Sequence, residues 1–146
     1  MSISFHIESV SKPRLKYRIV SIWLKQVVLK YGCITGDLTY IFCSDEYLKD
    51  INSKYLGHDY YTDIVTFDYN EGKIVSGDMF ISVNRVKENS ELFKCDLNEE
   101  FLRVMVHGLL HLIGYNDGSD LERGTMRKLE NECIFMYKEI WNDGIK

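Results

Sequence analysis

Residues 97–117, LNEEFLRVMVHGLLHLIGYND, contain the longest uncharged run of the chain, residues 104–116, and decide the centre of the fold. This run is apolar on nearly every side of a helix, which is typical of a helix that is buried. Asp96, with Glu99 three residues later, resembles a capping box at the start of such a helix. The sequence therefore predicts a buried helix over residues 97–113.

Two histidines, His107 and His111, lie four residues apart in this helix. Residues at positions i and i+4 share one face of a helix, so both imidazoles can point to the same place. Each imidazole needs a partner, because an unpaired buried polar group costs on the order of 1–3 kcal/mol. Backbone carbonyls can be those partners, and the pair is then structural. The alternative is a metal ion that both side chains bind.

The residues after the histidines favour the metal ion. Gly114 can adopt a left-handed conformation that reverses the chain over the helix end and brings Asp117 back beside the histidines. His107, His111 and Asp117 then offer two nitrogens and one carboxylate oxygen and leave a fourth position open, as in catalytic zinc sites. We predict these three residues as metal ligands and the two histidines as catalytic. The carboxylate also favours tolerance of divalent metals other than zinc.

The spacing H-x3-H-x2-G-x2-D matches the metzincin proteases with two differences. The glutamate that follows the first histidine in those enzymes, and acts as their general base, is Gly108 here. The third ligand is Asp117 instead of a histidine. Because a glycine inside a helix costs about 1 kcal/mol relative to alanine, we expect a packing reason for Gly108, such as the close approach of a strand. A peptidase is therefore disfavoured.

The rest of the chain predicts an α/β (α+β) fold with a small sheet of about four strands and about five helices. Alternating or β-branched segments predict strands at residues 2–8, 36–43, 63–69 and 73–83. Helical spacing predicts further helices at residues 14–31, 45–54, 83–94 and 120–141, with Pro13 in the first turn of the earliest one. With one proline, no repeat and no linker, residues 1–146 are expected to form a single domain.

Composition and the start of the sequence predict a cytoplasmic protein. Its four cysteines show no CxxC spacing and are expected to be reduced, no secretory signal is visible, and no apolar run is long enough for a membrane span.

Charge is distributed unevenly along the sequence. Residues 1–36 carry six basic side chains and one acidic side chain (net +5), and the remainder carries 12 basic and 21 acidic side chains (net −9). Such asymmetry is compatible with a nucleic-acid contact or with a solvated helix face.

HGLLHLIGYND (107–117) resembles the HGxLHLxGYDH motif of the YbeY family, bacterial single-strand-specific endoribonucleases and ribosomal RNA maturation factors. The resemblance extends to INSKYLGHDYYTDIVTFDY (51–69), SGDMFISVNRV (76–86) and TMRKLENE (125–132), which is similar to an MxxxE element of the family. It implies a mixed four-stranded sheet, one zinc ion per chain, and a cytoplasmic role in late rRNA maturation (16S rRNA 3′ end) and ribosome biogenesis, with ribosome-associated proteins as partners.

Two positions depart from the family pattern. The family's third zinc ligand is a histidine, where this chain has Asp117, and the arginine that the family is proposed to use for RNA is Leu56 here. We expect RNA binding to involve His58, Arg85 or the basic first helix, although each site is also compatible with a solvated surface. The residues concerned in that helix are Arg14 and Arg18.

Side chains near His58 add further expectations. The tyrosines Tyr55, Tyr60 and Tyr61 can stack on unpaired bases or lie at the edge of the core. Thr62 and Asp63 can line the cleft or cap a turn.

These features lead to one hypothesis and two rivals. The chain is expected to be a zinc-dependent endoribonuclease that acts on single-stranded RNA. Its general base is not identified by the sequence, and the attacking group is a metal-activated water or the neighbouring ribose 2′-hydroxyl. The first rival is a non-catalytic ribosome-assembly factor with a vestigial or structural metal. The second and weaker rival is a small metallopeptidase.

Overall fold

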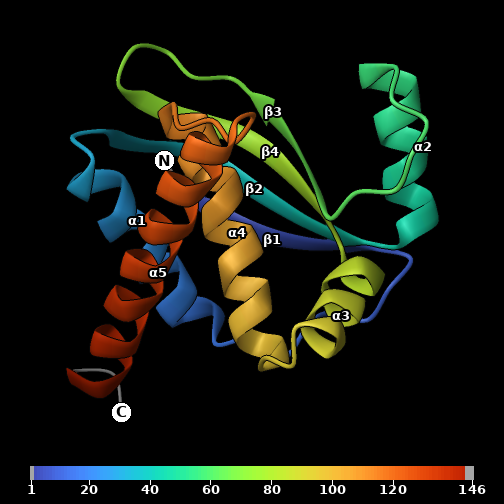
Figure 1. Ribbon diagram of the computed structural model, residues 1–146. Coiled ribbons are helices and arrows are strands. Elements are labelled where there is room, and N and C mark those ends of the chain that lie inside the picture. The colour runs from blue at the N-terminus through green and yellow to red at the C-terminus, as the bar shows by residue number, and fades with distance from the viewer. Residues whose placement is uncertain (1, 144–146) are drawn as a thin grey trace.

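The computed structural model describes residues 2–143 and contains one mixed sheet flanked by helices (Figure 1). The elements in chain order are β1 (Ile3–Glu8), α1 (Tyr17–Lys30), β2 (Ile34–Cys43), α2 (Asp45–Leu56), β3 (Ile64–Asp68), β4 (Ile74–Ser82), α3 (Val83–Leu92), α4 (Leu97–Ile113) and α5 (Asp120–Asp143). The strand order is β1-β2-β4-β3, with β1, β2 and β4 parallel and β3 antiparallel to β4. The predicted α/β fold with four strands and five helices is confirmed for these residues.

Helix α4 occupies the centre of the molecule, as its sequence predicts. It begins where the side chain of Asp96 accepts a hydrogen bond from the backbone N–H of Glu99, and ends at Gly114, which has a φ of 127°. One face of α4 contacts β3 and β4, and α1 and α5 contact it as well. Its buried residues are Glu100, Phe101, Leu102, Val104, Met105, Val106, Gly108, Leu109, Leu110 and Leu112.

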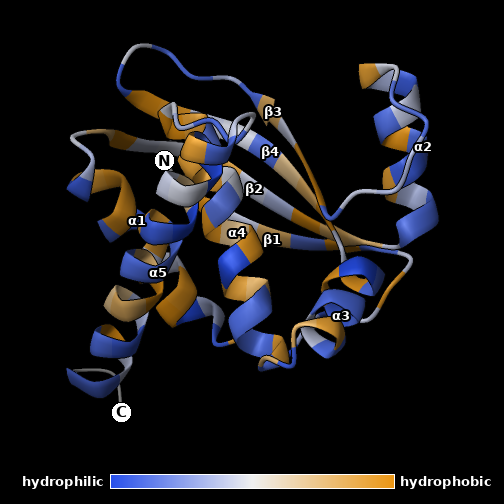
Figure 2. Cartoon of the chain, in the orientation of Figure 1, coloured by the Kyte–Doolittle hydropathy of each residue, from blue (hydrophilic) through white to orange (hydrophobic). Residues whose placement is uncertain are grey.

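The two faces of the sheet carry different hydrophobic clusters. Alternate residues such as Tyr40 and Met79 join the large cluster with α1, α4 and α5. Their neighbours on the opposite face, including Val65 and Phe80, join a small cluster under α2. In Figure 2 the strands carry more of the hydrophobic colour than α3, most of which is blue. No helix within residues 2–143 is both long and apolar enough to cross a membrane.

The start of α1 differs from its prediction. The helix begins at Tyr17, so the placement of Pro13 in its first turn is wrong. The carbonyl of Pro13 instead accepts hydrogen bonds from the backbone N–H of Leu15 and from the hydroxyl of Tyr17. These bonds form a separate turn before the helix.

Gly108 has the packing reason that its sequence predicts. A Cβ atom at this position would lie 2.6 Å from Cδ1 of Ile64, 3.2 Å from Sδ of Met79 and 3.3 Å from Cγ2 of Thr66. Helix α4 therefore packs so closely on side chains of β3 and β4 at residue 108 that a larger side chain requires these neighbours to shift.

We expect Gly108→Leu to lower the free energy of unfolding by about 1–3 kcal/mol, the usual cost of overpacking. Gly124 in α5 is the matched control, because a Cβ atom there meets nothing within 4 Å. Gly124→Leu is expected to raise stability by up to about 1 kcal/mol through helix propensity alone. Urea unfolding of both variants measures the difference. Equal changes in the free energy of unfolding of both variants, in the same direction, would show that the neighbours of residue 108 do not limit the size of its side chain.

Candidate metal centre

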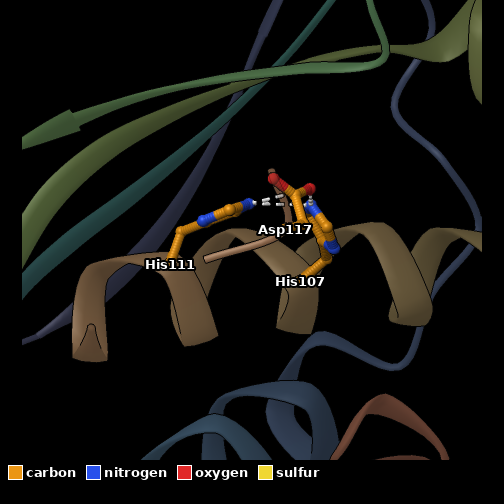
Figure 3. Close-up of side chains that lie close together, drawn as sticks. All are labelled: His107, His111 and Asp117. Carbon is orange, nitrogen blue, oxygen red and sulfur yellow. Dashed lines mark hydrogen bonds and ion pairs between the residues drawn. The ribbon is translucent and has the colours of Figure 1, made fainter. Parts of the chain in front are cut away.

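Three potential ligand atoms converge at the C-terminal end of α4 (Figure 3). The Nε2 atoms of His107 and His111 lie 3.0 Å apart, and Oδ2 of Asp117 lies 3.3 Å from each of them. All three side chains are partly buried. The structure therefore brings together the three residues that the sequence predicts as ligands.

The spacing of these atoms fits a tetrahedral metal ion. Ligand atoms at about 2.0–2.1 Å from a tetrahedral zinc lie about 3.3–3.4 Å from one another. The three observed separations, 3.0, 3.3 and 3.3 Å, are close to that value. Three ligands leave the fourth corner for a water or a substrate atom, as in catalytic zinc sites.

The loop after α4 holds Asp117 in position. The backbone N–H groups of Gly114 and Tyr115 both donate to the carbonyl of Leu110, which turns the chain back over the helix end. The ring of Tyr115 also packs edge-on against Tyr31 at 5.6 Å. The reversal at Gly114 is thus the local reason that a residue six positions after His111 returns to it.

Glu130 of α5 completes the surroundings of His107 and was missed as a functional residue. Its Oε2 lies 2.7 Å from Nδ1 of His107, and its Oε1 lies 3.2 Å from a guanidinium nitrogen of Arg103. A carboxylate only accepts hydrogen bonds, so Nδ1 carries the proton and Nε2 is free to bind a metal. Burial lowers the pKa of His107, but the hydrogen bond and charge of Glu130 outweigh it and the pKa is raised.

The three candidate ligands lie in a surface cleft of about 440 Å³ between α4 and the segment from α2 to β3. Its lining residues are Asn52, Leu56, His58, Tyr60, Thr62, Asp63, Ile64, Val65, Thr66, His107, His111 and Asp117. Thr62 and Asp63 therefore line the cleft. Burial raises the pKa of the Asp63 carboxyl, against an opposing effect of the charge on His107.

Of the four residues that we predict to contact RNA, only His58 lines this cleft. Arg85 instead forms ion pairs with Asp45 (3.0 Å) and Glu88 (3.4 Å). The two arginines of the basic segment lie elsewhere: Arg14 lines a separate groove with Trp141 of α5, and Arg18 is exposed on α1. RNA contact by these three arginines would extend beyond the metal cleft.

Fold and site together define a class: an α/β protein whose central helix and following loop present a three-ligand candidate metal centre. The sequence profile described as Endoribonuclease YbeY matches residues 4–138. The chain belongs to this family, whose members hydrolyse RNA at internal positions of the RNA strand.

Individual relatives agree over nearly the whole length. The chain is 48% identical over 139 residues to the Endoribonuclease YbeY of Parabacteroides distasonis, covering 95% of this chain and 98% of that one. It is 44% identical over 136 residues to that of Bacteroides thetaiotaomicron, with 93% and 99% covered. The solution structure of TM1509 from Thermotoga maritima aligns with a TM-score of 0.67 at 22% identity, covers 99% of both chains, and is similar in fold.

Proposed function

We propose that this chain is a zinc-dependent endoribonuclease that cuts single-stranded RNA in late-stage rRNA maturation, at the 3′ end of 16S rRNA, as part of ribosome biogenesis. Residues 1–146 then act as a single metal-dependent hydrolase domain in the cytoplasm, beside ribosome-associated proteins. One observation carries the proposal: the convergence of His107, His111 and Asp117 in a cleft of a chain from an endoribonuclease family.

The donor set favours zinc. Imidazole nitrogens suit zinc and other transition metals, while the carboxylate also accommodates harder ions such as manganese. His107 and His111 would hold the ion through Nε2, and Asp117 through Oδ2. When bound, zinc would act as a Lewis acid that stabilises negative charge on the scissile phosphate.

Asp63 is the carboxylate of the cleft outside the three ligands. We assign to it the acceptance of the proton from the attacking hydroxyl. Burial raises the pKa of its carboxyl toward the range in which a base both ionises and accepts a proton effectively. In its ionised form this carboxylate is the proton acceptor that Gly108 cannot provide.

Single-turnover cleavage of an unstructured RNA tests the proposal. We expect cleavage that a chelator stops and added zinc restores, one zinc per chain by metal analysis, and neither property in His107→Ala. Casein and peptides are expected to remain intact, because the chain belongs to an endoribonuclease family and has Gly108 where the metzincin proteases have their catalytic glutamate. Cleavage that persists in His107→Ala after chelation would refute the assigned site. A chelator-sensitive peptidase activity that disappears in His111→Ala would refute the choice of substrate.

A second candidate function is that of a non-catalytic ribosome-assembly factor with a structural metal. One observation favours it: of the residues that the structure describes, those that line the metal cleft include no lysine or arginine to bind a phosphate. The position where the family has an arginine is Leu56, which is 42% exposed at the cleft. A zinc-loaded chain that binds RNA without cutting it would support this candidate.

The basic segment before and within α1 is expected to contact phosphates. Charge reversal of Arg14 and Arg18 to glutamate should weaken RNA binding and flatten its dependence on salt, because fewer counterions are released. The matched control reverses two exposed lysines on and after α3, Lys87 and Lys94, with the same change in net charge. Fluorescence anisotropy across a salt series gives both slopes. If reversal of Arg14 and Arg18 leaves the salt dependence of RNA affinity unchanged, these arginines are only solvent-exposed surface residues.

A further inference from the structure

The loop between α2 and β3 places two stacked aromatic rings in the metal cleft. The imidazole of His58 and the phenol of Tyr60 lie 5.2 Å apart between centroids with an interplanar angle of 15°. The hydroxyl of Tyr60 also lies 3.1 Å from Nδ1 of His58. Both side chains are exposed, and both line the cleft that contains the three ligands.

The backbone beneath these rings is fixed although the rings are exposed. Gly57 ends α2 with a φ of 69° and turns the chain toward the cleft. Asn52, which is only 2% exposed, binds the loop at two places. Its carbonyl accepts from the N–H of His58 at 3.1 Å, and its Nδ2 donates to the carbonyl of Tyr60 at 3.2 Å. The pair is therefore positioned before any ligand binds, which lowers the entropic cost of binding.

The other exposed tyrosines nearby have different partners. Tyr55 packs edge-on against Phe67 and lines a separate pocket on the α2 side of the sheet. The hydroxyl of Tyr61 donates to Glu46, and the guanidinium of Arg85 lies over its ring. Of the three tyrosines that the sequence offers for stacking, only Tyr60 lines the metal cleft, and His58 lies beside it there.

We propose that His58 and Tyr60 form a subsite for one unpaired nucleobase next to the scissile phosphate. This inference rests on the proposed function and adds a means of substrate selection. Among residues 2–143 the lining of the cleft includes no lysine or arginine to pair with the phosphates around the scissile one, so stacking supplies a larger share of RNA binding there. Bases in a duplex are already stacked and cannot reach the subsite. The His58–Tyr60 pair, here called the stacking platform, would therefore select single-stranded RNA.

An abasic scan tests the subsite. The probe is an unstructured RNA decamer, compared with decamers that lack one base at each position in turn, and binding is measured on chelator-treated protein so that no RNA is cut. We expect one position where loss of the base weakens binding to the wild-type chain by about 5- to 150-fold. Tyr60→Ala should weaken binding to the intact decamer by a similar factor and should show no further loss on the abasic decamer.

Controls separate stacking from folding and from catalysis. Tyr60→Phe retains the ring and should bind nearly as the wild-type chain does, whereas Tyr55→Ala, outside the cleft, should retain the abasic effect. Zinc content is measured for every variant. The platform is refuted if Tyr60→Ala binds both decamers as the wild-type chain does, or if no abasic position weakens binding. In either case, zinc-dependent cleavage by the wild-type chain would still support the proposed function. If the binding results are as expected but the wild-type chain cuts no RNA, the stacking platform is supported and the proposed function is refuted.

Discussion

Asp117→Ala is expected to lose most of its bound zinc and to reduce RNA cleavage to the level of His107→Ala. Oδ2 of Asp117 lies 3.3 Å from both imidazole nitrogens, so alanine removes one of three ligands and a negative charge that balances the ion. Isothermal titration with zinc and metal analysis measure the change. Asp120→Ala is the matched control, because its side chain is 99% exposed. Both its zinc content and its cleavage are expected to match those of the wild-type chain.

Asp117→His distinguishes the charge of the third ligand from its presence. Zinc with two neutral histidines and one aspartate has a net charge near +1, compared with about +2 for three histidines. We expect this variant to retain zinc and to move the onset of activity with rising pH to lower pH, since a more positive site favours the deprotonated form of groups that it contacts. If Asp117→Ala instead binds stoichiometric zinc with unchanged affinity, Asp117 is no ligand and Asp120 becomes the next candidate.

Glu130→Gln is expected to weaken zinc binding by about 10- to 100-fold, which is typical when a carboxylate behind a metal-binding histidine is replaced. The glutamine can occupy the same space, but without charge it holds the Nδ1 proton of His107 less firmly. Removal of the charge also lowers the pKa of His107, which reduces competition between protons and zinc at low pH. The affinity is therefore best compared at alkaline pH, where only the loss of orientation remains.

Stability measurements separate this effect from simple damage to the core. Glu130 also pairs with Arg103 at 3.2 Å, so Glu130→Gln leaves a partly buried guanidinium without its charged partner and should lower the melting temperature. Glu132→Gln, an exposed change two residues later on α5, is the control. Nitrogen-15 NMR of the imidazole gives a further measure, because a folded variant that keeps the proton on Nδ1 and wild-type zinc affinity would contradict the role of Glu130.

The convergence of the three candidate ligands could be predicted from the sequence because their geometry is local. His107 and His111 are brought together by helical spacing alone, and the return of Asp117 needs only the turn at Gly114. Their agreement with the structure therefore depends on one helix and its end. The burial of α4 could also be predicted, because a helix that is apolar on all sides is unstable when exposed to water.

Glu130 could not be found in the same way. It lies 23 residues from His107, on another helix, and only the packing of α5 against α4 brings the two together. The resemblance of residues 125–132 to a family element marked the segment, but without a role for any residue. Arg85 shows the opposite case: its charge is visible in the sequence, while its pairing with Asp45 depends on the fold.

The tight contact at Gly108 also bears on the evolutionary history open to this scaffold. Glycine codons that end in A or G become glutamate codons by a single nucleotide change, so from such a codon the glutamate of a metzincin protease is one mutation away. In this fold that mutation places a Cβ atom 2.6 Å from Ile64 and close to Met79 and Thr66. Acquisition of the base therefore depends on whether Ile64, Met79 and Thr66 shift or have first been replaced by smaller residues, which is a form of epistasis between α4 and the sheet.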